Sequence, residues 1–217
     1  MSKTLRYITF IETLLFAGIV AAFIWKWQAE YRLSWIIFPF WLTASFVVHR
    51  DTAKTLGWRT DNLLLATRQG LLFFFASVIA ICVAGIALGA LHHLPEHLFD
   101  GHRFIGYLSF CLLQQVAMNS YVMNRLLASV GNARLSAALA GLIFAAVHWP
   151  NPVLIPITLV GGFAMCLLFA RRRNILPLVL GQAILGGLIW WAFPVSWHHG
   201  MRVGPGFYSY AQRLVTW

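Results

Sequence analysis

The residues of this chain that could do chemistry are polar side chains inside long apolar segments. Gln114, Gln115 and Asn119 fall within one such segment, and Gln182 falls within a later one. Gln115 and Asn119 are four residues apart and share a helix face, while Gln114 lies about 100° away around the helix. Carboxamides at membrane depth either join helices by hydrogen bonds or mark a functional site. Both interpretations stay open at this point.

Two ionisable side chains complete the set. His148 ends an apolar segment, one helical turn after Phe144, and is followed by Trp, Pro and Asn151. A histidine can act as a general base near neutral pH, although at a helix end it is more often a capping residue. Glu12 lies within the first apolar segment. It could pair with a basic group or, if it reaches His148, orient the imidazole.

The segments that carry these residues are long and apolar enough to cross a bilayer. Of the 217 residues, 60% are hydrophobic and only 10% are charged. About 20 apolar residues span about 30 Å of hydrocarbon. No soluble fold accounts for several segments of this length and composition in one chain. We therefore predict an all-α, polytopic transmembrane helix bundle that forms a single domain over residues 1–217. The seven predicted spans are residues 7–25, 34–48, 69–91, 103–127, 135–149, 153–170 and 175–193.

The distribution of basic residues predicts the orientation of the bundle. With the N-terminus in the cytoplasm, eleven Lys and Arg residues lie on the inner side and five on the outer side, as the positive-inside rule requires. Topology and anionic lipid headgroups account for the net charge of +10, so we expect no nucleic-acid partner. The inner set is Lys3, Arg6, Arg50, Lys54, Arg59, Arg68, Arg125, Arg134, Arg171, Arg172 and Arg173; the outer set is Lys26, Arg32, Arg103, Arg202 and Arg213.

Small residues predict the closest helix contacts. Ala137, Gly141 and Ala145 form a ladder at four-residue spacing, and Gly85 and Gly89 form a second, shorter step. Such spacings let helix backbones approach closely in lipid.

The tail, residues 194–217, is too polar to span the membrane. Within this interfacial tail, the density of glycine, proline and aromatic residues over residues 197–208 predicts an ordered loop with turns, not a helix. It could also form a lid over a cavity, with Arg202 facing a carboxylate or a phosphate.

The order and spacing of these residues resemble the CAAX protease and bacteriocin-processing (CPBP, or Abi) family of intramembrane proteases. The family pattern is Glu-Glu-x-x-x-Arg on one helix, Phe-x-x-x-His on a second and His-x-x-x-Asn on a third. The resemblance covers residues 103–187 and implies an integral protein of the bacterial inner (plasma) membrane. The corresponding residues here are Gln114, Gln115 and Asn119, then Phe144 and His148, then Gln182 and Gly186.

The departures from this pattern change what the resemblance implies about activity. In the family, the first-motif glutamate is understood to activate a water molecule. Gln114 and Gln115 replace both first-motif acids, and a neutral carboxamide cannot accept a proton as a general base. Among the matched positions only His148 titrates. Amides are also poor zinc ligands, so we expect neither a metal nor another cofactor.

Three functions remain open from the sequence. The first is a divergent family member with weakened or lost catalysis, which binds a transmembrane or lipidated polypeptide in a polar intramembrane cavity. The second is an active endopeptidase with His148 as the base. A small membrane transporter is the third, although the chain has no visible internal repeat. For catalysis the candidate residues are His148, Gln114 and Gln115, and for substrate binding they are Asn119, Gln182 and Asn151, with Glu12, His198 and His199 as further candidates.

Overall fold

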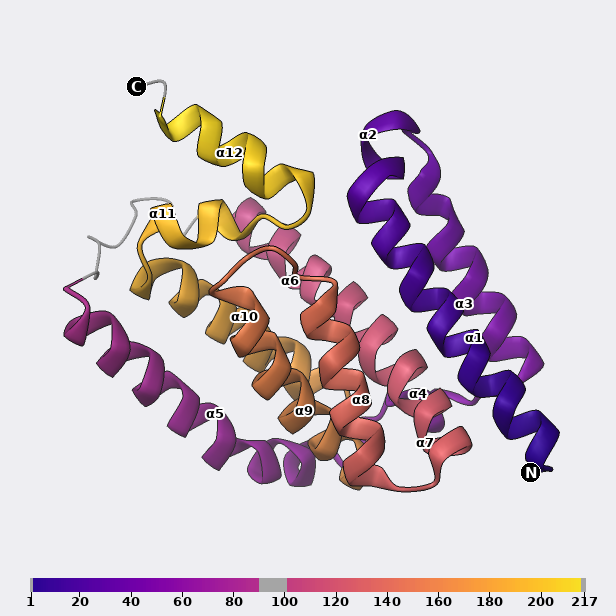
Figure 1. Ribbon diagram of the computed structural model, residues 1–217. Helices are drawn as coiled ribbons and strands as arrows, with labels where there is room; N and C mark the ends of the chain where they lie inside the picture. Colours follow the sequence, from indigo (N-terminus) through magenta and orange to yellow (C-terminus); the bar gives the residue numbers. More distant parts are fainter. Residues whose placement is uncertain (1, 90–100, 216–217) are drawn as a thin grey trace.

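The computed structural model describes residues 2–89 and 101–215, and throughout these residues the chain forms helices and no strands (Figure 1). The predicted all-α bundle is therefore confirmed. Residues 90 and 91 of the third predicted span lie outside the described residues, as do the last two residues of the tail. The longer helices are α1 (Lys3–Ala22), α3 (Ile37–Val48), α5 (Leu63–Ala87), α6 (Gly101–Gln115), α8 (Ala133–Ala146), α9 (Leu154–Arg172) and α10 (Leu176–Ala192).

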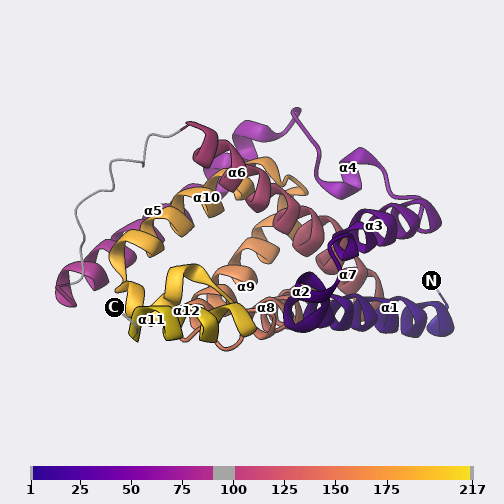
Figure 2. The same ribbon diagram turned by 90° about the horizontal axis from the view of Figure 1, so that it is seen from above.

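The first two predicted spans form a helical hairpin on one side of the molecule. The N-terminal helix α1 begins at the Ser2 cap, whose hydroxyl accepts the Leu5 amide, and it continues through a π-helical turn, Phe23–Trp27, into α2 (Gln28–Glu30). The chain then reverses and runs back as α3 (Figure 2). The helix α5 lies on the opposite side of the bundle in both views.

The centre of the bundle is a wide π-helical segment, η4 (Val116–Met123), between α6 and α7 (Asn124–Val130). Its residues from Met118 to Met123 are all buried. The largest apolar core cluster includes Tyr121 and Met123 of this segment, together with Phe16 of α1 and Phe169 of α9. The fourth predicted span is thus the element around which the others pack.

Small residues set the closest helix contacts, as the ladder predicted. A Cβ on Gly141 would lie 2.9 Å from the carbonyl oxygen of Leu159, so α8 and α9 touch along their backbones. The second predicted step was wrong, because α5 ends at Ala87 and Gly89 lies beyond the helix with a left-handed φ of 58°. The α5–α10 contact instead depends on Gly181, where the ring of Phe74 fills the space of the missing side chain.

The tail differs from the predicted loop. It forms α11 (Val195–His198), a 3-10 turn (His199–Met201) and an eleven-residue helix, α12 (Pro205–Val215). The prediction failed because Pro205 follows Gly204, which has a φ of 55°, and proline is well suited to the first turn of a helix. The helices α11 and α12 lie at the end of the bundle opposite the N-terminus (Figure 1).

The number of helices that can cross a membrane is smaller than the number of predicted spans. Among the described residues, three helices are long and apolar enough, namely Lys3–Glu30, Leu63–Ala87 and Leu154–Arg172. A fourth would be Leu176–Ala192 joined to Val195–Met201, a pair bent by 117°. The second and fifth predicted spans correspond to shorter apolar helices, Ser34–Val48 and Ala133–Ala146. The chain is an integral membrane protein in which several helices are too short to cross the bilayer on their own.

Candidate intramembrane site

Four carboxamide side chains form one hydrogen-bonded chain across the helix bundle. Asn119 Nδ2 donates to Gln115 Oε1 (2.5 Å), and Gln115 Nε2 donates to Gln182 Oε1 (2.6 Å). Gln182 Nε2 in turn donates to Gln114 Oε1 (2.5 Å). The structure therefore brings together Gln114, Gln115 and Asn119 from the fourth predicted span with Gln182 from the seventh. The carboxamides that stand out in the sequence thus contact one another between two helices of the bundle.

The order of donors and acceptors along these four amides leaves one amide donor unused at one end. The second proton of Gln115 Nε2 points to the Met165 sulfur at 3.3 Å, so both Gln115 donors are used. The Gln114 amide nitrogen, in contrast, has no protein partner among the described residues, and the Gln114 side chain is only half-buried. At the other end, the oxygen of the fully buried Asn119 has no partner in the described part of the chain. The amide chain thus ends at Gln114 as a donor.

The wide turn of η4 explains how these amides come together. The π-helical geometry begins at Val116, directly after the paired glutamines, and contains Asn119. π-helical turns inside α-helices are frequently found at functional sites. Asn119 lies in this turn, four residues after Gln115, and is fully buried.

His148 lies at the mouth of the same region and is held by its own helix. Its Nδ1 is 2.6 Å from the carbonyl oxygen of Phe144, and the two rings meet edge to face. A carbonyl oxygen only accepts, so Nδ1 carries the proton and neutral His148 presents Nε2 as a free acceptor. The group that orients this imidazole is a backbone carbonyl and not a carboxylate.

A large cavity connects His148 to the amide chain. Its volume is about 1620 Å³, and Gln114, Gln182 and His148 all line it. Most of the remaining lining side chains are apolar, and in the described part of the chain none of them is Lys, Arg, Asp or Glu. Gln115 and Asn119 lie behind this wall, buried at 3% and 0% exposure. The cavity is therefore an apolar chamber with a few neutral polar groups.

Asn151 joins the His148 loop to the tail. Its Nδ2 donates to the carbonyl oxygens of His198 (2.8 Å) and Arg202 (3.0 Å). Its Oδ1 accepts from the amides of Val153 and Leu154 at the start of α9. All the hydrogen-bonding groups of this side chain are used internally. We predicted Asn151 as a substrate-binding residue. In this structure its side chain holds the tail, whose residues Gly200, Met201 and Val203 line the cavity.

These contacts predict that Asn151→Asp loosens the tail without removing the α9 cap. The aspartate keeps both acceptor contacts but cannot donate to the two tail carbonyls. We expect a loss of about 1–3 kcal/mol of stability and faster hydrogen exchange across residues 198–204. Exchange measured by mass spectrometry, with residues 133–146 as the internal reference, tests this. Unchanged exchange in the tail would show that Asn151 does not hold it.

Glu12 belongs to a separate buried cluster rather than to the His148 region. Its carboxylate accepts from Ser45 Oγ (2.5 Å) and Tyr121 Oη (3.1 Å) and lies 2.8 Å from His49 Nε2. Arg125, which is 2% exposed, has its Nε 3.7 Å from the same carboxylate. The expectation that Glu12 might serve His148 is not met.

Arg125 is the central residue of this cluster, and sequence reasoning missed it. Its guanidinium donates to Asp51 Oδ2 (2.6 Å) and to Ser45 Oγ, and it lies over the rings of Phe46 and Tyr121. The signal that could have found Arg125 was its position, six residues after Asn119 on a predicted membrane helix. These contacts join the α1–α3 hairpin to η4 and α7.

Arg173 closes the same end of the bundle. It follows α9 with a left-handed φ of 49° and donates to Asn124. Burial lowers the pKa of the Arg173 guanidinium, and the nearby Asp51 carboxylate opposes that shift. The N-terminus, α4 (Ala53–Leu56) and α7 lie at this end in Figure 1.

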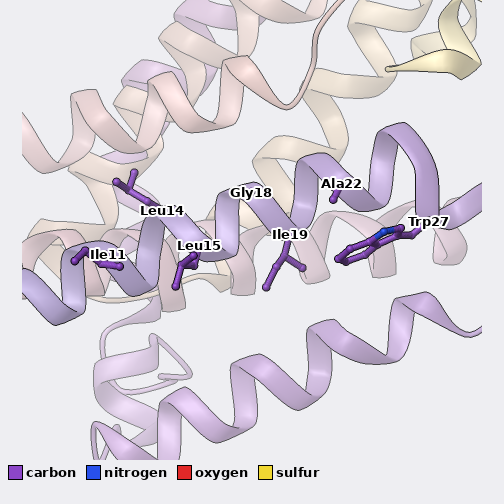
Figure 3. A pocket seen from close by; sticks show the side chains of 7 residues that line it. All are labelled: Ile11, Leu14, Leu15, Gly18, Ile19, Ala22 and Trp27. Carbon is purple, nitrogen blue, oxygen red and sulfur yellow. The ribbon is translucent and has the colours of Figure 1, made fainter.

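A second hollow, on the outer face of α1, lacks comparable chemistry. It is a shallow groove of about 410 Å³, and Figure 3 shows its apolar side chains side by side along the helix. Ile11, Leu14 and Leu15 in this groove are about half exposed, as expected for side chains that face lipid tails. Among the described residues, no group of three or more His, Cys, Asp or Glu side chains could hold a metal ion.

Comparison with known proteins points to the family that the motifs indicated. Residues 101–188 match the family model described as type II CAAX prenyl endopeptidase Rce1-like. The matched segment contains the predicted motif-bearing range, 103–187, so the predicted resemblance is confirmed. No curated protein and no solved structure matches the chain significantly.

Proposed function

Because residues 101–188 match the family model of Rce1-like type II CAAX prenyl endopeptidases, we propose that the chain is a divergent member of that family and that it binds more than it cleaves. Its ligand is a transmembrane or lipidated polypeptide, held in the cavity between the α1–α3 hairpin and the rest of the bundle. Catalysis is weak or lost.

The observation that carries this proposal is the state of the first-motif glutamines. Gln114 Oε1 and Gln115 Oε1 are both acceptors of amide protons in the hydrogen-bonded chain. Neither side chain can take a proton from water, and each oxygen already accepts one hydrogen bond from another amide. The groups that should activate water are used to join helices.

The cavity supports a ligand with a large apolar part. At about 1620 Å³ it exceeds the usual size of small-molecule pockets, about 300–1,000 Å³. Its apolar lining suits an alkyl or isoprenoid chain or the side chains of a helix. The neutral polar groups near Gln114 then meet the polypeptide backbone.

The binding proposal can be tested by filling the cavity. A Cβ on Gly161, which lines the cavity, would meet no atom within 4 Å, so Gly161→Phe enters open space without a backbone clash. We expect it to weaken binding of a fluorescent farnesylated tetrapeptide at least tenfold, measured by anisotropy in nanodiscs. The matched control is Gly106→Phe on α6, also in open space but outside the cavity, which should bind as the native protein does.

The alternative function, an active endopeptidase that uses His148, is favoured by one observation. The Phe144 carbonyl fixes the tautomer in which Nε2 of His148 is the free base. In that mechanism His148 takes the proton of the attacking water, while Gln114 and Gln182 hold the scissile carbonyl. The experiment that separates the two functions is peptide turnover, because both require binding.

Three further expectations accompany the proposal. The chain forms one transmembrane domain over residues 1–217, in a bacterial plasma membrane, with a cytoplasmic N-terminus. Arg173 contacts Asn124 of α7, and α7 lies at the same end of the bundle as the N-terminus in Figure 1, which agrees with that orientation.

A further inference from the structure

A hydroxyl group from another helix occupies the space of the missing side chain at position 186. A Cβ on Gly186 would lie 1.8 Å from Tyr107 Oη and 3.0 Å from Tyr107 Cζ. Gly186 is buried in α10, one turn after Gln182. Tyr107 of α6 therefore reaches into a notch in α10 that exists only because residue 186 has no side chain.

This hydroxyl stands on the cavity wall beside the end of the amide chain. Tyr107, Gln114, Gln182 and Gly186 all line the cavity. Tyr107 and Gln114 are seven residues apart on α6, which places them on the same helix face. In a mainly apolar site, a few polar groups such as these fix the orientation of the ligand.

The proton of Tyr107 is available to a ligand. The side chain nearest to this hydroxyl on its own helix is that of Cys111, one turn along α6. A thiol sulfur is a weak acceptor, so a carbonyl oxygen that enters the cavity can displace it. Tyr107 and Gln114 then present two donors to the same space.

The charge of the cavity limits what these donors can meet. They require an acceptor, but in the described part of the chain no Lys or Arg lines the cavity to balance an anion. An isolated carboxylate would be costly to bury there, whereas a neutral carbonyl would not. The ligand group that fits these two donors is therefore a neutral main-chain carbonyl.

We propose that Tyr107 is a positioning residue of the cavity, whose hydroxyl donates, together with the Gln114 amide, to a backbone carbonyl of the bound polypeptide. Gly186 is the residue that makes room for it. This inference rests on the proposed binding function and names the group by which the polypeptide is recognised.

The test compares two probes that differ in one acceptor atom. The first is the fluorescent farnesylated tetrapeptide, and the second carries a thioamide, a weaker acceptor, at the peptide bond next to the lipidated cysteine. We expect Tyr107→Phe to weaken binding of the first probe about fivefold and to change binding of the second less than twofold. Tyr31→Phe, at a tyrosine that is 59% exposed and outside the cavity, is the matched control and should match the native protein for both probes.

A second pair of variants checks the notch itself. Gly186→Ala should displace the hydroxyl and weaken binding of the first probe, but in the Tyr107→Phe background it should have a much smaller further effect. Independent effects of the two substitutions would show that Tyr107 does not occupy this space in the working protein. If the native protein binds both probes equally and Tyr107→Phe changes neither, the inference is wrong while the binding function stands. If the native protein binds neither probe, both are overturned.

Discussion

Purified native protein in proteoliposomes is expected to cleave farnesylated or transmembrane peptides no faster than empty vesicles do. General acid–base catalysis by a positioned side chain contributes about 10²–10⁴ to a rate, and the first-motif positions hold amides that cannot supply it. Peptide products separated by mass spectrometry over long incubations measure this. The Phe144 carbonyl orients His148 but does not stabilise a charged imidazolium as a carboxylate would.

The control for this assay is His148→Ala. Turnover by the native chain that disappears in this variant would replace the binding function with the endopeptidase function. Equal background in both proteins would support the proposal, provided that the native protein binds the peptide.

The amide chain also decides which glutamate substitutions the fold accepts. Glutamine and glutamate are nearly isosteric, which predicts that Gln114→Glu with Gln115→Glu is tolerated. The structure changes that expectation, because Gln182 lies between the two side chains and donates to one while accepting from the other. Gln114→Glu alone keeps its contact with Gln182 Nε2. The double variant would place two carboxylates around one amide and should be the less stable protein.

The largest effect on stability is expected at Arg125. Arg125→Ala should lower the free energy of unfolding by about 3–5 kcal/mol, because it leaves the partly buried Glu12 and Asp51 carboxylates without their buried cation. Thermal unfolding in detergent, followed by circular dichroism, measures the loss. Arg125→Lys should be intermediate, since an ammonium keeps the charge but cannot contact both Ser45 and Asp51 with a planar fork.

Two comparisons make this prediction specific. Arg134→Ala removes an exposed arginine from the start of α8 and should change stability by less than about 0.5 kcal/mol. Asp51→Asn combined with Arg125→Ala should cost less than the sum of the single variants, because the two groups form one ion pair. Additive losses would mean that the contact between Arg125 and Asp51 contributes little.

The residues of the candidate site could be predicted from the sequence because polar groups are expensive in a membrane. Gln114, Gln115, Asn119 and Gln182 stood out by type alone, and the cost of an unpaired amide implied that they meet. The partners of each could not be predicted. The hydrogen bonds depend on the π-helical turn after Gln115 and on the close approach of α10.

Tyr107, Arg125 and Asn151 show what the sequence alone could not reveal. Tyr107 carries no signal in the sequence, and only the contact with Gly186 gives it a place on the cavity wall. Arg125 was counted among the basic residues of the inner side, yet it is buried and contacts three residues far away in the sequence, Glu12, Ser45 and Asp51. The tail was predicted as a loop from its composition, although Pro205 begins a helix.

The sequence by itself determined that this protein is an all-helical membrane protein, and it located the amides and the histidine that distinguish the chain. These properties are local, since they depend on the cost of moving each side chain into lipid. Only the tertiary structure decided which polar groups meet: the amides with one another, Glu12 with Arg125 and His49, and Asn151 with the tail. Residues more than thirty positions apart are brought together by helix packing, and a single glycine or a wide helical turn is enough to change that packing.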